Sequence, residues 1–160
     1  NSIHFLDLFS WFVGDSKIKL NGELLSNEIL ENKRGNNFVE FSGTVSGSTK
    51  NGNFFSMTFK PEIDDSVIVN ISLGNQTHLI VDETNGKITP YGKTEIPDLK
   101  FKFEFVSDTT TRVIDDIFTK DSCLLPSLVE LFQIHSEVFR VFNTHLNKFS
   151  NNDIEICPIT

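Results

Sequence analysis

The sequence predicts an α+β fold: a predominantly antiparallel sheet of about six strands with helices packed on one face. Two observations carry this prediction. Short segments with alternating apolar residues follow one another between residues 17 and 106, joined by short turn-like connections. Segments with helical spacing stand before and after this block, at residues 3–13, 110–119 and 126–148. Short connections favour antiparallel neighbours, so the block is expected to form a meander.

Residues 3–13 are expected to form the first helix. Apolar and aromatic side chains cover most of its circumference, so we expect this helix to be largely buried. Gly14 followed by Asp15 is a suitable C-terminal stop, because glycine readily takes the left-handed conformation that ends many helices.

Turn residues separate the expected strands. Residues 28–37 are polar and end in Arg-Gly-Asn-Asn, which indicates a turn. Asn85-Gly86 is a strong hairpin signal. In the last strand Phe101, Phe103 and Phe105 alternate with charged residues, which is the period of a half-buried strand. The expected strands are residues 17–25, 38–45, 53–60, 66–73, 77–82, 87–91 and 99–106.

After the strands the chain changes to helical spacing. Residues 110–119 are expected to form a short helix, and Pro126 suits the first turn of a longer amphipathic helix that ends near Lys148. Residues 154–160 form a tail suited to add an edge strand. The apolar stripe predicted for the longer helix is Leu128, Leu131, Phe132, His135, Val138, Phe139, Phe142 and Leu146.

Charge and hydropathy exclude two classes of partner. The net charge is -8, and the lysines and arginines form no cluster that could displace counterions from nucleic acid. The same balance argues against an anionic membrane surface. No segment reaches the ~18 apolar residues of a membrane span. We therefore expect a cytoplasmic protein that binds neither nucleic acid nor membrane.

The candidate chemical groups are scattered. Cys123 and Cys157 are expected to be reduced thiols, and no CxxC or HExxH spacing indicates a metal site. Asn70 and Asn75 lie in glycosylation sequons, which arise by chance in an asparagine-rich chain. No glycine-rich phosphate loop is present. The remaining histidines, His78, His135 and His145, are expected to be structural or surface groups.

The opening residues Ile3, His4, Asp7, Trp11, Gly14 and Asp15 form a pattern. This pattern resembles the segment that begins the second domain of the glucose–fructose oxidoreductase and inositol dehydrogenase (GFO/IDH/MocA) family. Residues 125–127, His135 and residues 143–145 also resemble the closing helices of family members that act on nucleotide sugars. The resemblance covers the whole chain by layout, and by motif it rests mainly on the first fifteen residues.

The resemblance implies that residues 1–160 are a single C-terminal domain for substrate binding and dimerisation, cut from its parent enzyme. The N-terminal dinucleotide-binding domain, which would hold NAD or NADP, is absent from this chain. The substrate would be a sugar, sugar nucleotide or polyol, and the domain would pair as a homodimer through its sheet. The chain alone is expected to be inactive.

The resemblance assigns roles to two residues. His4 matches the family's catalytic histidine, which takes the hydroxyl proton as hydride leaves the substrate; the alternative is a core histidine near a helix start. Arg112 lies near where some nucleotide-sugar members place a Thr-Arg pair that contacts substrate; the alternative is a solvated helix arginine.

Two other classes of protein stay open. Residues 39–47 and 59–62 are compatible with a non-enzymatic β-rich binding module, such as a receptor-binding head. The sequons at Asn70 and Asn75 are compatible with a fragment of a secreted glycoprotein. Helices rich in phenylalanine at both ends of the chain argue against the first of these, because a sheet sandwich does not need them.

Overall fold

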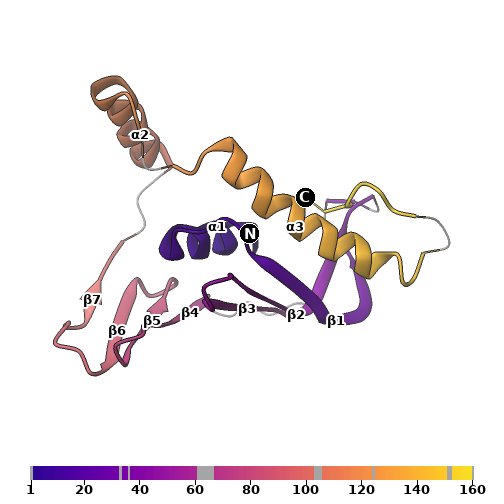
Figure 1. Ribbon diagram of the computed structural model, residues 1–160, viewed down its shortest axis with the longest axis horizontal. Helices are drawn as coiled ribbons and strands as arrows, with labels where there is room; N and C mark the ends of the chain where they lie inside the picture. The colour runs from indigo at the N-terminus through magenta and orange to yellow at the C-terminus, as the bar shows by residue number, and fades with distance from the viewer. Residues whose placement is uncertain are drawn as a thin grey trace. The chain divides into compact units, whose positions relative to one another are not determined.

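The computed structural model describes residues 2–32, 34–35, 37–60, 67–102, 106–123, 125–150 and 153–159. These residues form an α+β fold with two antiparallel sheets, of three and four strands (Figure 1). The predicted fold class is confirmed, although the strands divide between two sheets. The elements are α1 (Ser2–Val13), β1 (Lys19–Glu31), β2 (Val39–Ser48), β3 (Phe54–Phe59), β4 (Ile68–Ser72), β5 (Thr77–Asp82), β6 (Lys87–Gly92), β7 (Leu99–Lys100), α2 (Val106–Lys120) and α3 (Leu128–Leu146).

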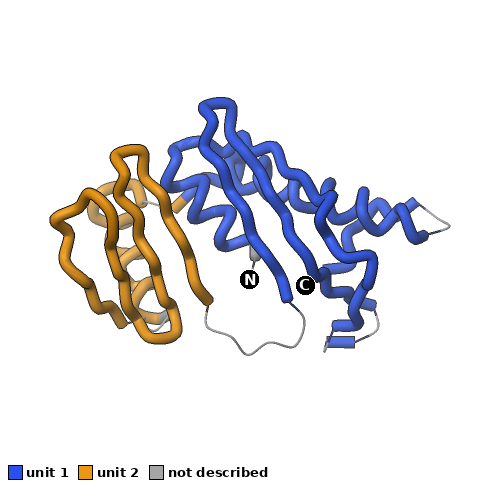
Figure 2. The backbone as a smooth tube through the Cα atoms, turned by 90° about the horizontal axis from the view of Figure 1, so that it is seen from below, with its two compact units in different colours: residues 1–62, 126–160 blue, residues 63–125 orange. Residues whose placement is uncertain are grey.

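The chain divides into two compact units (Figure 2). Unit 1 comprises Asn1–Glu62 and Pro126–Thr160 and contains α1, α3 and the sheet β1-β2-β3. Unit 2 comprises Ile63–Leu125 and contains α2 and the sheet β4-β5-β6-β7. The sequence analysis indicated no internal boundary, because neither junction has a composition change or a low-complexity linker.

Unit 1 has its core between the two helices and one face of its sheet. Figure 1 shows α1 and α3 on the same side of β1, β2 and β3. Leu6 of α1 and Ile134 of α3 are almost completely buried, with 1% and 2% of their surfaces exposed. Burial of one such side chain stabilises the fold by roughly 1.5–3 kcal/mol. The buried core consists of Leu6, Ile18, Leu20, Leu25, Val45, Ile134, Val138, Val141 and Phe142.

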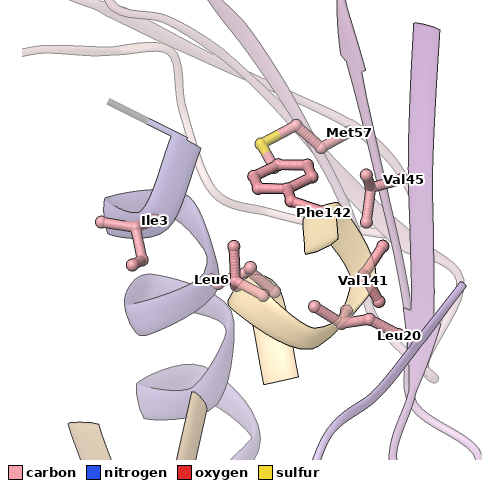
Figure 3. A pocket seen from close by; sticks show the side chains of 8 residues that line it. Ile3, Leu6, Leu20, Val45, Met57, Val141 and Phe142 are labelled. Atoms are coloured by element: carbon pink, nitrogen blue, oxygen red, sulfur yellow. The ribbon is translucent and has the colours of Figure 1, made fainter. Parts of the chain in front are cut away.

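A gap inside this core is too small to be a ligand site. Its volume is about 10 Å³, and its lining is apolar and comes from α1, α3 and all three strands (Figure 3). A void of this size is at the lower limit for one water molecule, and it offers no polar partner to hold one. It is therefore a dry packing defect.

Helix α1 matches its predicted bounds, but the prediction that it is largely buried is wrong. Leu6 is buried, whereas Leu8, Trp11 and Phe12 are 39%, 58% and 54% exposed. The reason is geometric, since the unit's core contacts only one side of a surface helix. Gly14, with φ of 64°, ends the helix in the left-handed conformation as predicted.

Strand β1 is longer than predicted and continues into the first residues of the polar segment 28–37, whereas the turn predicted at the end of that segment is present around Gly35. Its pairing with β2 contains register shifts between Asn21 and Leu24 and between Leu25 and Ile29. These bulges let the strand continue past its first apolar run to Glu31. Gly43, with φ of 103°, lies opposite Leu25, and a Cβ there would come within 2.4 Å of the Leu24 carbonyl oxygen. Only glycine fits this position.

Helix α3 begins at Leu128, two residues later than predicted. Ser127 is the N-cap, and it forms a capping box with Glu130, so Pro126 precedes the cap instead of occupying the first turn. The predicted apolar stripe is confirmed at Val138, Phe142 and Leu146, which are buried. It is wrong in the first turns, where Leu128 and Phe132 are 83% and 71% exposed. The stripe that the core covers is Ile134, Val138, Val141, Phe142, His145 and Leu146.

The C-terminal tail does not add a full strand in its described part. Residues 153–159 have no strand assignment, but the Pro158 carbonyl accepts a hydrogen bond of 2.8 Å from the Val39 amide at the start of β2. The expected edge strand is thus reduced to one backbone contact.

The described residues of unit 2 include no buried apolar side chain. Its sheet is a meander, and Gly86, with φ of 59°, lies in the predicted β5–β6 hairpin turn. Within the described part of this unit Thr77 alone is buried, and its hydroxyl donates to the Lys93 carbonyl. The predicted last strand, residues 99–106, is too long, because β7 contains only Leu99–Lys100 and Val106 already begins α2. Phe103 and Phe105 of the predicted alternation lie outside the described residues.

Glu137 and Arg140 of α3 form an ion pair that hydrogen-bonds the free edge of β1 at Leu20. The Glu137 carboxylate accepts hydrogen bonds from the Leu20 amide at 2.9 Å and from the Arg140 guanidinium at 2.7 Å. Arg140 in turn donates to the Leu20 carbonyl at 3.2 Å. The two side chains therefore satisfy both backbone groups that an edge strand would otherwise leave open at Leu20.

This arrangement predicts a pH-dependent contribution to stability. The Arg140 hydrogen bonds lower the pKa of Glu137, with smaller lowering effects from the Leu20 amide and nearby positive charge, against the opposing effect of burial. A lowered carboxyl pKa means stability that is present above the unfolded-state pKa and lost as pH falls through the folded-state pKa.

We expect Glu137→Gln to lower the free energy of unfolding by about 1–2 kcal/mol near neutral pH. The difference from the wild type should shrink as pH falls below about 4, because the wild-type carboxylate then also loses its charge. Urea unfolding over a pH series measures both values. Exposed Glu155→Gln makes the same charge change and is the control; equal effects of the two substitutions would contradict the assignment.

Candidate functional site

The first candidate residue, His4, lies on the solvent side of α1 in unit 1. His4 is exposed, and Leu8 and Trp11 follow it at helical spacing of four and seven residues. This spacing places the three side chains on one face of the helix. The aromatic ring of Trp11 also contacts Phe12 edge to face, with ring centroids 5.3 Å apart. We call His4, Leu8, Trp11 and Phe12 the α1 face.

The α1 face combines two kinds of chemistry. An exposed imidazole can accept a proton near neutral pH. An exposed tryptophan offers a flat apolar surface on which a sugar ring or another aromatic ring can pack. Leu6 anchors the opposite side of the same helix, with 1% of its surface exposed. The face is therefore presented from a fixed helix rather than from a loop.

Asp7 connects this helix to α3. Its Oδ1 lies 3.3 Å from Nε2 of His135, and the two side chains are 21% and 31% exposed. Because a carboxylate only accepts hydrogen bonds, Nε2 of His135 must carry the proton and donate. Asp7 is three residues from His4 and four from Trp11, so it neighbours both on the helix.

The second candidate, Arg112, lies on α2 in unit 2 and is exposed. It takes part in side-chain interactions of its own. Since His4 belongs to unit 1, each unit by itself holds one of the two candidates and neither assembles both into one site.

The remaining histidines have structural surroundings, in line with the sequence interpretation. His145 is 3% exposed, and its Nε2 donates to the Ser26 carbonyl at 2.8 Å. Its Nδ1 is buried without a partner in the described structure, which fits a neutral ring protonated at Nε2. His78 stacks on Tyr91, with centroids 4.9 Å apart, and hydrogen-bonds Ser72.

The thiols and carboxylates of the described residues do not assemble into a metal site. Cys123 and Cys157 are both free, as expected. Burial raises the pKa of the Cys157 thiol to about 11, which keeps it protonated and unreactive at neutral pH. The described residues contain no group of three or more histidine, cysteine, aspartate or glutamate side chains that could hold a metal ion.

The open face of the β1-β2-β3 sheet is rich in hydroxyl groups. Its side chains alternate with the core residues Leu20, Val45 and Phe55 and so point away from the helices. The strand register places them in three cross-strand rows: Lys19, Ser48 and Phe54; Asn21, Ser46 and Ser56; Leu24, Thr44 and Thr58. Phe54 and Leu24, at opposite corners, are 68% and 71% exposed.

The same face is shallowly hollowed at one end. A depression of about 260 Å³ is lined by residues of the first two rows and by Leu20 and Gly47. The face thus combines two exposed apolar side chains, Leu24 and Phe54, with many hydroxyl groups. Such a surface suits contact with another protein surface better than enclosure of a small ligand.

No protein-family model, curated protein or solved structure matches this chain. Within the described ranges no helix has both the length and the apolar character to cross a membrane.

Sequence reasoning identified His4 but missed its surroundings. The exposure of Leu8 and Trp11 was missed because the helix has apolar residues all round, which indicates burial. The i, i+4, i+7 spacing of His4, Leu8 and Trp11 was the available signal. The Asp7–His135 contact joins residues 128 positions apart, and nothing local in the sequence indicates it.

The contrast between exposed and buried histidines gives a direct stability test. We expect His4→Ala to change the free energy of unfolding by less than about 0.5 kcal/mol, as for other exposed positions. We expect His145→Ala to cost about 2–4 kcal/mol, because it removes a buried hydrogen bond and leaves a cavity. Chemical denaturation measures both. A large loss with His4→Ala would show that His4 is a structural residue.

Proposed function

We propose that this chain is the substrate-binding and dimerisation domain of an NAD(P)-dependent oxidoreductase that acts on a hydroxyl group of a sugar, sugar nucleotide or polyol. The observation that supports this best is the placement of His4. It is an exposed imidazole on the same helix face as the exposed Trp11, two turns away, and the other side of the helix is anchored by Leu6. A general base needs both access to its substrate and a fixed position.

In the proposed reaction His4 takes the proton of the substrate hydroxyl. The nicotinamide, held by a separate dinucleotide-binding domain of the parent, supplies the hydride acceptor when bound. The described residues contain no glycine-rich phosphate loop that would hold a dinucleotide themselves. Trp11 offers an apolar surface for the sugar ring, and Arg112 is the proposed contact for a polar or anionic part of the substrate.

The free state of Cys123 and Cys157 supports a cytoplasmic location for this enzyme. Thiols stay reduced in that compartment, whereas small secreted domains commonly depend on disulfides.

The catalytic proposal is tested in the parent enzyme. We expect His4→Ala to reduce turnover by about 10²–10⁴-fold, the usual contribution of a general base, with the fold intact. Arg112→Ala should raise KM more than it lowers kcat. Steady-state kinetics with circular dichroism as the folding control measures these effects. A loss below about threefold for His4→Ala would contradict a role as the base and favour a non-catalytic binding domain.

The open sheet face supports the proposed homodimer. Helices cover only one face of the β1-β2-β3 sheet, and Leu24 and Phe54 remain exposed on the other. Unit 2 likewise has no buried apolar residue in its described part. A second copy packed against these sheets would remove apolar surface from water, and two-fold pairing is the commonest form of association.

We expect sedimentation velocity at about 100 μM to show a dimer, since this exceeds the Kd of most stable interfaces. Leu24→Ser with Phe54→Ser should shift the chain towards monomer. Phe118→Ser is the matched control, because Phe118 is 85% exposed on α2 rather than on a sheet. A monomer at this concentration, or equal effects of the sheet and α2 variants, would count against the sheet-mediated dimer.

A further inference from the structure

We propose that the hydrogen bond between Asp7 and His135 is a positioning contact that sets the rotation of α1 and thereby the direction in which His4 and Trp11 are presented. The role of the α1 face rests on the proposed function. The positioning itself is a property of unit 1 and is argued from its geometry.

The apolar contacts of α1 hold the helix against the core but do not by themselves set its exact rotation. Leu6 is fully buried, and Ile3 and Phe9 pack against the core as partly buried residues. Burial of apolar surface is favourable but has no preferred direction. A shift of the helix by one residue would turn each side chain by about 100°, which would carry His4 away from its present face. A directional contact is needed to select one rotation.

The Asp7–His135 pair supplies that direction. Its members come from different helices of the same unit, and both are largely shielded from water, at 21% and 31% exposure. A partly buried hydrogen bond to a charged group is stronger than the usual surface pair. Its carboxylate end lies one helical turn from both His4 and Trp11, so an error in its placement moves both side chains.

A second contact from α3 fixes the chain just after α1. The Ser16 hydroxyl donates to Oε1 of Gln133 at 2.9 Å, two residues before His135. The Ser10 hydroxyl also donates to the Asp15 carbonyl at 3.1 Å and closes the end of the helix. One segment of α3 therefore holds α1 at its middle and at its exit.

The test uses the 160-residue chain and its single tryptophan as the reporter. The Trp11 indole N–H signal and the His4 ring signals are recorded by NMR in the wild type and three variants. His135→Leu keeps the side-chain bulk and removes the donor, whereas His135→Gln restores a donor without an imidazole ring. Glu137→Gln weakens the contact of α3 with β1 instead of α1 and is the matched control.

We expect His135→Leu to shift the Trp11 and His4 signals and to raise the unfolding equilibrium constant about fivefold. His135→Gln should return both signals towards the wild type, which would also exclude a ring-current effect of the lost imidazole. Glu137→Gln should destabilise the chain to a similar degree and leave both signals in place. Unchanged signals in His135→Leu, or equal shifts in Glu137→Gln, would overturn the proposal.

If His135→Leu does not fold, Asp7→Asn replaces it, because this change keeps the shape of the side chain and removes the carboxylate. A double-substitution cycle of Asp7→Asn and His135→Ala, which removes the donor, then gives the coupling, expected to be at least threefold in the unfolding constant. Additive effects would overturn the proposal. None of these measurements uses turnover, so a failure of His4 as a catalytic base would leave their outcome unaffected.

Discussion

The structure of unit 1 depends on one packing constraint: two helices cover a single face of a three-stranded sheet. Leu6 of α1 and Phe142 of α3 meet Val45 of β2 in this layer, and each is at most 4% exposed. Because only one side of each helix can enter the layer, the opposite sides remain in solvent. The α1 face and the open face of the sheet are both consequences of this arrangement, and the proposed functions lie on these two surfaces.

Directional polar contacts set the orientation of the elements that apolar packing holds together. Along α3, His135 contacts Asp7 of α1, and Gln133 contacts Ser16 just after that helix. Glu137 and Arg140 hydrogen-bond the backbone of Leu20 in β1. His145 hydrogen-bonds the Ser26 carbonyl. A single helix thus sets the placement of its neighbours through side chains spaced over three turns. Unit 2 has no such helix over its sheet among the contacts described, and its apolar side chains stay partly exposed. Because these sheet side chains are not covered within one chain, we expect association with a second copy to bury them.

Much of the fold could be predicted from residue patterns, and the failures have physical causes. Alternation located most strands, and Gly14 and Asn85-Gly86 located a helix end and a hairpin correctly. Strand β1 was predicted to end at Leu25 because the residues that follow are polar, whereas register shifts on both sides of the Leu25–Gly43 pair keep residues up to Glu31 in the sheet. The stripe on α3 was displaced because apolar spacing continues into turns that the core does not cover. In the candidate site, His4 was proposed from a family resemblance. The contact between Asp7 and His135 could not be predicted, because no local sequence pattern indicates a pair 128 residues apart.

We propose that His4 is an accessible base which substrate covers in the parent enzyme. The most direct measurement is the rate of diethyl pyrocarbonate modification at each histidine, followed by mass spectrometry with and without cofactor and sugar substrate. We expect His4 to react readily in the free enzyme and to be protected at least tenfold in the complex, while partly exposed His78 serves as an internal reference. If His4 is not modified in the free enzyme, or if saturating substrate and cofactor leave its modification rate unchanged, His4 is not a base that substrate covers.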